Sequence, residues 1–208
     1  LVCDGHGFGA IWYEKLHPAA KLLHGRPITL QQLLSPLSDY DTAIMIGQHA
    51  RAGVKTSNQN HTQDYDLIDW MKLNDTLIGE IAQFALYAGA YGIPLIFLSG
   101  EQAACDEAEK LVPGITTASV KKGLSRGAAI SLSTSESRQC IRAGIRRAAE
   151  RHLQNPIDAL AWSGPYRLDK RFTTTDAADV AAGQHGAERI DDQIVRFDSE
   201  HIQDIIYR

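Results

Sequence analysis

Short apolar runs alternate with longer helix-like segments along most of the chain. Strand-like patterns predict strands at residues 1–3, 42–46, 94–98, 116–120, 167–172 and 193–197. Apolar side chains at helical spacing predict helices at residues 79–91, 101–111, 135–154, 174–182 and 199–207. This alternation is typical of layered folds, so we expect one three-layer α/β domain over residues 1–208 with a mostly parallel or mixed central sheet.

The composition fits an ordinary globular protein and argues against several classes of function. Hydrophobic residues make up 44% and charged residues 22% of the 208 positions. The net charge of −4 gives no reason to expect a nucleic acid or an anionic membrane as a partner. No apolar run approaches the roughly 20 residues that a helix needs to cross a bilayer.

The cysteines and the first residue bear on where the protein works and where it begins. Cys3, Cys105 and Cys140 are odd in number and scattered, so we predict no disulfide and a reducing, cytoplasmic environment. The chain starts with Leu1 inside an apolar run. We therefore expect an upstream segment that this sequence lacks.

Three short segments place side chains that can bind a metal where predicted strands end or a predicted helix begins. His6 follows the first predicted strand, and His49 lies just past the strand that ends at residue 46. Glu80 opens the helix predicted at residues 79–91. In open α/β sheets, ligands bind outside the carboxyl ends of the strands. Two imidazoles and a carboxylate that converge there would form a zinc site with an open position.

Each of these residues also has a simpler interpretation. His6 and His49 could be loop histidines that hydrogen-bond to the backbone, and Glu80 could only stabilise the helix dipole. Asp4, two residues before His6, could bind a metal directly or orient His6. The pattern alone leaves these alternatives open.

Two further polar residues could act on a substrate. Arg51, two residues after His49, could neutralise a carboxylate or bind a substrate oxygen. His61 lies in a polar loop, and because histidine exchanges protons near neutral pH, it could carry protons beside a metal site. Most loop histidines have no such role, so this assignment also stays open.

Several stretches in order along nearly the whole chain resemble the zinc-dependent D-aminopeptidase family. They cover residues 2–7, 14–18, 47–52, 73–75, 79–81, 91–95, 99–100, 107–113, 116–121 and 125–126. The resemblance implies a two-zinc site and removal of the N-terminal residue, with a preference for D-amino acids, from short peptides. It makes His6, His49 and Glu80 metal ligands and His61 the catalytic histidine. It also implies a ring-shaped homo-oligomer that admits only short peptide substrates.

The chain departs from the family pattern at its start. The family's first strand carries an Asp-x-Glu pair that supplies two more ligands, and this pair would precede Leu1. Without it, His6, His49 and Glu80 could still hold one zinc ion. A two-metal clamp would be compromised. Two alternatives to the peptidase are therefore another zinc amidohydrolase on the same scaffold and a catalytically silent subunit of a ring assembly.

Overall fold

The computed structural model describes residues 1–5, 11–24, 37 and 39–208, which fall into two compact units, Leu1–Tyr40 and Asp41–Arg208. In the first unit β1 (Val2–Cys3) pairs in parallel with β2 (Leu22–Leu23), and a short 3-10 helix spans Tyr13–Lys15. The first predicted strand is thus present. The predicted ligand His6 lies outside the described residues, and the single domain over residues 1–208 stays a prediction.

The second unit contains a four-stranded mixed sheet in the order β3-β6-β7-β8. Its strands are β3 (Ala43–Gln48), β6 (Leu95–Glu101), β7 (Thr116–Ser125) and β8 (Ala128–Ser131). The first three run parallel, and β8 returns antiparallel to β7. The carboxyl ends of the three parallel strands therefore meet at one edge of the sheet.

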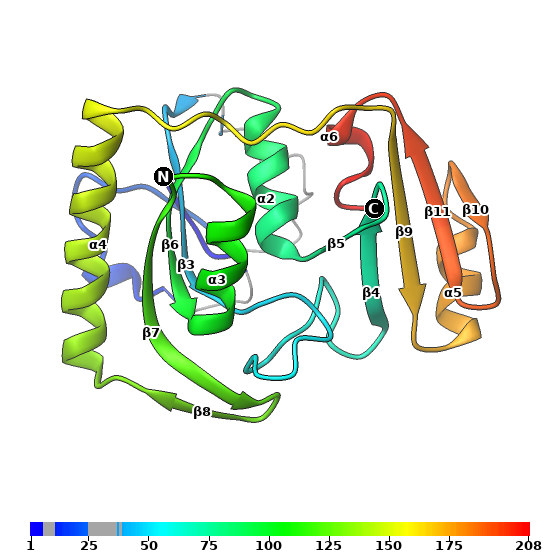
Figure 1. The fold of residues 1–208 in the computed structure, drawn as a ribbon, viewed down its shortest axis with the longest axis horizontal. Helices are drawn as coiled ribbons and strands as arrows, with labels where there is room; N and C mark the ends of the chain where they lie inside the picture. Colours follow the sequence, from blue (N-terminus) through cyan, green and yellow to red (C-terminus); the bar gives the residue numbers. More distant parts are fainter. Residues whose placement is uncertain (6–10, 25–36, 38) are drawn as a thin grey trace. The chain divides into compact units, whose positions relative to one another are not determined.

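Helices cover both faces of this sheet, which explains why every residue of β6 is buried. Figure 1 shows α4 (Thr134–Gln154) on one side and α2 (Glu80–Gly89) with α3 (Gln102–Leu111) on the other. On the α4 side, the helix approaches so closely at Gly144 that a Cβ there would lie 2.5 Å from the Phe97 ring. The predicted α/β fold with a mixed central sheet is confirmed.

A second, antiparallel sheet has the order β10-β11-β9-β4-β5. Its strands are β4 (Ile68–Leu73), β5 (Thr76–Ile78), β9 (Tyr166–Phe172), β10 (Ala187–Arg189) and β11 (Ile194–Ser199). Helix α5 (Thr175–Ala182) and helix α6 (Ile202–Ile205) contact it. The sequence predicted only β9 and β11 of these strands.

Two predicted helix boundaries were wrong because the preceding strands continue further. Strand β6 includes Glu101, so α3 begins one residue later than predicted. Strand β11 runs through Ser199, which leaves α6 only the four residues Ile202–Ile205 in place of the predicted 199–207. The first correction matters for the site, because it puts the Glu101 carboxylate at a strand end.

The cysteines and the helices bear on two further predictions. Cys3, Cys105 and Cys140 are all free, so no disulfide links them. Burial raises the pKa of Cys105 to about 11, which makes it an inert core thiol. Within the described residues, no helix has the length and apolar character needed to cross a bilayer.

Candidate metal centre

Three side chains in the second unit bring metal-binding atoms together. His49 directly follows β3, His61 lies in the loop beyond it, and Glu80 is the first residue of α2. One nitrogen or oxygen atom from each lies within 4.8 Å of the others. Glu80 Oε2 is 3.6 Å from His49 Nε2, and Glu80 Oε1 is 3.7 Å from His61 Nε2. The expected approach of His49 to Glu80 is present, and His61 joins them.

Hydrogen bonds to backbone carbonyls determine which nitrogen of each histidine carries hydrogen and which one faces Glu80. His49 Nδ1 is 3.0 Å from the Ala50 carbonyl oxygen, and His61 Nδ1 is 2.7 Å from the Gln59 carbonyl oxygen. A carbonyl can only accept, so both Nδ1 atoms carry the hydrogen and donate it. In the neutral imidazole the lone pair is then on Nε2, and both Nε2 atoms point towards Glu80. Metal-binding histidines are usually oriented in this way.

The two imidazole rings also support each other by stacking. Their centroids lie 4.1 Å apart with an interplanar angle of 29°. The His61 side chain is 7% exposed and that of His49 15%, whereas Glu80 is 29% exposed and opens the cluster to solvent. Burial is the main effect on the pKa of His49 and lowers it, although the Ala50 carbonyl and Glu80 act in the opposite direction. A neutral imidazole is the form that binds a metal.

The start of α2 holds Glu80 from two sides. Gly79 precedes it in an extended conformation, and a Cβ there would lie 2.6 Å from Arg51 Cβ, so only glycine fits. The Gln63 N–H donates to Glu80 Oε1 at 3.0 Å. Gln63 has a φ of 63°, a left-handed conformation that few side chains adopt freely. Lys170 Nζ stabilises it by donating to Gln63 Oε1 at 2.9 Å.

Glu101 is a buried carboxylate that the sequence analysis did not assign to the site. It is 2% exposed and lies at the carboxyl end of β6. It accepts from the Ala50 N–H at 3.1 Å, from the Asn58 N–H at 2.6 Å and from the Ser57 hydroxyl. These contacts fasten the loop between His49 and His61 to the sheet. A carboxylate just past a buried apolar run was the signal that could have identified it.

Arg51 and Asp4 are the other two predicted site residues. Arg51 donates from its backbone N–H to Glu107 Oε2 at 2.9 Å and from its guanidinium to the Ala52 carbonyl at 3.0 Å. Burial raises the pKa of Glu107, and the hydrogen bond and charge of Arg51 oppose that shift. Asp4 lies in the first unit, where its N–H donates to the Leu23 carbonyl at 3.2 Å. Their roles towards a substrate stay predictions.

The cluster has the chemistry and spacing of a divalent-metal site. Zinc bonds of about 2.0–2.2 Å in a tetrahedron place neighbouring ligand atoms roughly 3.3–3.6 Å apart. The separations of 3.6 and 3.7 Å, which join His49 and His61 to different oxygens of Glu80, lie at the upper end of that range or just above it. Two neutral imidazole nitrogens and one carboxylate oxygen are ligands that zinc accepts, and three of them leave a coordination position open.

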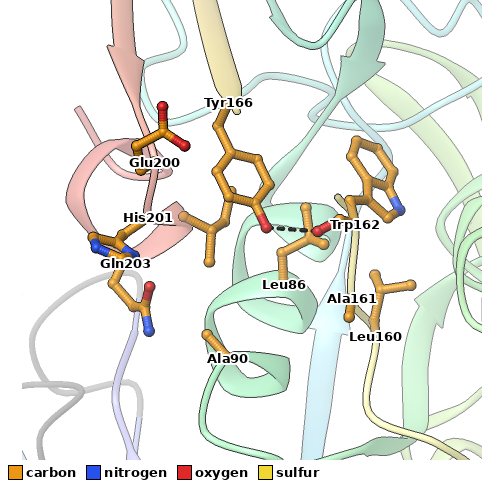
Figure 2. A pocket seen from close by; sticks show the side chains of 10 residues that line it. Leu86, Ala90, Leu160, Ala161, Trp162, Tyr166, Glu200, His201 and Gln203 are labelled. Atoms are coloured by element: carbon orange, nitrogen blue, oxygen red, sulfur yellow. Dashed lines mark hydrogen bonds between the residues drawn. The ribbon is translucent and has the colours of Figure 1, made fainter. Parts of the chain in front are cut away.

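A separate cavity of about 150 Å³ lies elsewhere in the second unit. Figure 2 shows Leu86 of α2 and Ala90, the residue after this helix, on one side, and Trp162 and Tyr166 on another. The Tyr166 hydroxyl donates to the Trp162 carbonyl at 2.5 Å, and Glu200 lies at the edge. The cavity lining includes none of the three residues of the cluster. The candidate centre is therefore identified by its donor atoms and not by a deep pocket.

Comparison with known proteins identifies the family of this chain. A family model described as D-aminopeptidase, peptidase M55, matches residues 1–207. The chain belongs to the D-aminopeptidase family. A family relative, a D-aminopeptidase of Bacillus subtilis (strain 168), is 35% identical over 136 residues, which are 64% of this chain and 48% of that protein. The chain thus spans about half the length of this curated relative.

A solved structure from the same family is also similar. It is described as the Zn-dependent D-aminopeptidase DppA from Bacillus subtilis, a self-compartmentalizing protease. It superposes with a TM-score of 0.85 at 26% identity, over 94% of this chain and 70% of that chain. The resemblance to the family that the sequence motifs indicated is confirmed.

Proposed function

We propose that this D-aminopeptidase family member is a zinc-dependent hydrolase that removes the N-terminal residue, preferably a D-residue, from short peptides. The observation that carries the proposal is the convergence of His49 Nε2, His61 Nε2 and the Glu80 carboxylate. Family membership supports the choice of peptide over other amides. The zinc dependence of the Bacillus subtilis structural relative supports the choice of metal.

In this proposal His49 and Glu80 bind zinc together with His6, and His61 transfers the proton. A bound zinc ion would supply Lewis acidity for the scissile carbonyl and the attacking water. The Ala50 carbonyl orients His49, and the Gln63 N–H orients Glu80. His61 Nε2 carries a lone pair beside Glu80, so it can accept a proton from water and return it to the leaving amine. The complete family site would hold two zinc ions.

The same proposal includes the assembly and its surroundings. We propose a ring-shaped homo-oligomer in the cytoplasm that admits only short peptides. The description of the structural relative as self-compartmentalizing supports the closed assembly. The three free cysteines support a reducing compartment.

Metal analysis combined with a peptide panel tests the function. The purified full-length protein should contain zinc and should hydrolyse D-alanyl-D-alanine faster than L-alanyl-L-alanine. Hydrolysis of amides that lack a free N-terminus, with no hydrolysis of dipeptides, would favour another zinc amidohydrolase. Absence of both zinc and hydrolysis in a correctly assembled oligomer would favour the catalytically silent subunit.

A further inference from the structure

An arginine lies beside the candidate metal centre, connected to it by two ring contacts. Arg126 sits in the turn between β7 and β8, and its Cζ is 3.5 Å from the centroid of the Tyr65 ring. The Tyr65 ring meets the His61 ring edge to face, with 5.8 Å between centroids. Tyr65 is 39% exposed and Arg126 is exposed, so this side of the cluster is open to a ligand.

The loop that carries His61 fixes the direction of this guanidinium. Arg126 Nε donates to the Asn60 carbonyl at 3.3 Å, and its NH2 group donates to the Tyr65 carbonyl at 2.6 Å. In return the Gln59 N–H donates to the Arg126 carbonyl at 2.8 Å. A guanidinium has five N–H donors, so these two bonds leave further donors for a ligand. Arg126 is therefore held in place and still has N–H donors available for a ligand.

The charge of Arg126 has no carboxylate partner in the described part of the chain. Its side chain donates to backbone carbonyls, and none of the ion pairs among residues 39–208 includes it. Arg51 is the other arginine near the cluster. Its guanidinium donates to the Ala52 carbonyl, and its charge favours the ionised form of the nearby Glu107 carboxylate. Arg126 is thus the better placed of the two to receive an anionic group.

We propose that Arg126 binds the C-terminal carboxylate of the peptide whose N-terminal residue is removed. This inference rests on the proposed function. The two ring contacts, of 5.8 and 3.5 Å, keep Arg126 Cζ within about 9 Å of the His61 ring centroid. Two extended residues span about 7 Å, so a dipeptide held at the cluster can extend its carboxylate to the Arg126 guanidinium. A guanidinium binds a carboxylate with two parallel hydrogen bonds, and stacking on Tyr65 keeps its plane fixed. The preferred substrates are therefore dipeptides with a free carboxylate.

Comparing a dipeptide with its amide isolates this contact. The values of kcat/KM for D-alanyl-D-alanine and D-alanyl-D-alaninamide are measured for the wild type and for Arg126→Met and Arg126→Lys. Wild type should prefer the free acid. Arg126→Met should lose roughly 10- to 100-fold on the acid, the usual value of a charged hydrogen bond, and change little on the amide. Arg126→Lys should recover part of the loss, and zinc content should be unchanged in both variants.

Lys122→Met is the matched control, because Lys122 is another exposed cation on the β7–β8 hairpin. It should leave both substrates unaffected. An equal loss on acid and amide in Arg126→Met would show that Arg126 only supports the His61 loop, and would overturn the inference. Equal rates on acid and amide in the wild type would also overturn it while leaving the peptidase intact. Hydrolysis of neither peptide by zinc-containing wild type would instead remove the proposed function itself, and the inference with it.

Discussion

At the scale of single residues, the candidate centre depends on how each histidine is held. His49 and His61 both donate from Nδ1 to a backbone carbonyl and present Nε2 to Glu80. Their surroundings differ, because His49 lies at a strand end whereas His61 contacts Tyr65 in a loop. The proposal assigns them different roles, and substitutions separate those roles.

His49→Ala should lose zinc and activity together, because it removes a metal ligand. His61→Ala should retain zinc and lower kcat by roughly 10²- to 10⁴-fold, because it removes proton transfer. Zinc content by elemental analysis and kcat on a D-alanyl dipeptide measure both effects. Loss of zinc from His61→Ala would make His61 a ligand, and unchanged turnover would remove it from the mechanism.

Glu101 is expected to determine how firmly the metal-binding loop is held. The Ala50 and Asn58 N–H groups donate to different oxygens of Glu101, so Glu101→Gln places an amide NH2 opposite one of these two donors. The unfolding free energy should fall by about 1–3 kcal/mol, and zinc affinity should weaken because His49 is less constrained. Denaturant titration and competition with a zinc chelator measure these effects. Asp106→Asn, an exposed carboxylate on α3, is the control and should change neither quantity.

At the scale of elements, the clearest strand predictions were the continuous apolar runs of the central sheet. Such runs occur where helices cover both faces, as in β6, and they can be recognised without knowledge of the fold. Strand β4 was missed because a register irregularity between Ile68 and Trp70 disrupts its alternation. Strands β8 and β10 have only four and three residues. Short edge strands depend on their partners more than on their own sequence.

The hairpin between β4 and β5 had a local signal that the sequence analysis overlooked. Asn74 and Asp75 both have positive φ, 46° and 67°, which is the conformation of a type I′ turn. Asp75→Gly should raise the unfolding free energy by up to about 1 kcal/mol, because glycine adopts this conformation without strain. Thermal unfolding measures the change.

Asn74→Gly provides the contrast, because the Asn74 side chain makes hydrogen bonds that glycine cannot make. It accepts from the Arg167 N–H at 2.8 Å and donates to the Pro165 carbonyl at 3.2 Å. Losing these bonds should outweigh the relief of strain, so this variant should be less stable than wild type. A stabilised Asn74→Gly would show that the side-chain bonds contribute little.

At the scale of the second unit, residues far apart in sequence meet around the site. His49 and Glu80 could be predicted because each lies at the end or start of a regular element. The direction of His61 could not, because it depends on the left-handed conformation of Gln59 and on Tyr65 held by Arg126. These contacts require the β7–β8 hairpin, because its turn carries Arg126. The placement of His6 stays a prediction.

Lys170 connects three distant parts of this unit. From β9 it donates to Gln63 beside the cluster and to the carbonyl of the last residue, Arg208, at 2.5 Å. Burial lowers its pKa from the ordinary 10.5 to about 8, although Asp64 acts in the opposite direction. The unfolded chain therefore holds this proton between about pH 8 and 10.5, where the folded protein has released it.

Because of Lys170, the unfolding free energy should therefore increase as pH rises through that window. Below about pH 8 both states are protonated, so the penalty for burying the charge is constant. Lys170→Met removes this titration. The unfolding free energy of the wild type minus that of the variant should therefore increase by up to about 3 kcal/mol between pH 8 and 10.5. Denaturant melts across this range test it, and a difference that stays flat would contradict the lowered pKa.

The carbonyls that orient the two histidines have a consequence for how this site can evolve. They belong to Ala50 and Gln59, and every amino acid carries the same main-chain oxygen. A substitution at either position cannot remove the carbonyl oxygen. It can only change the backbone conformation that directs this oxygen towards the histidine. At Gln59, where φ is 61°, glycine or asparagine would preserve that shape. Where the main-chain shape is kept, residue type can change without loss of the imidazole geometry, which an alignment of letters alone would not reveal.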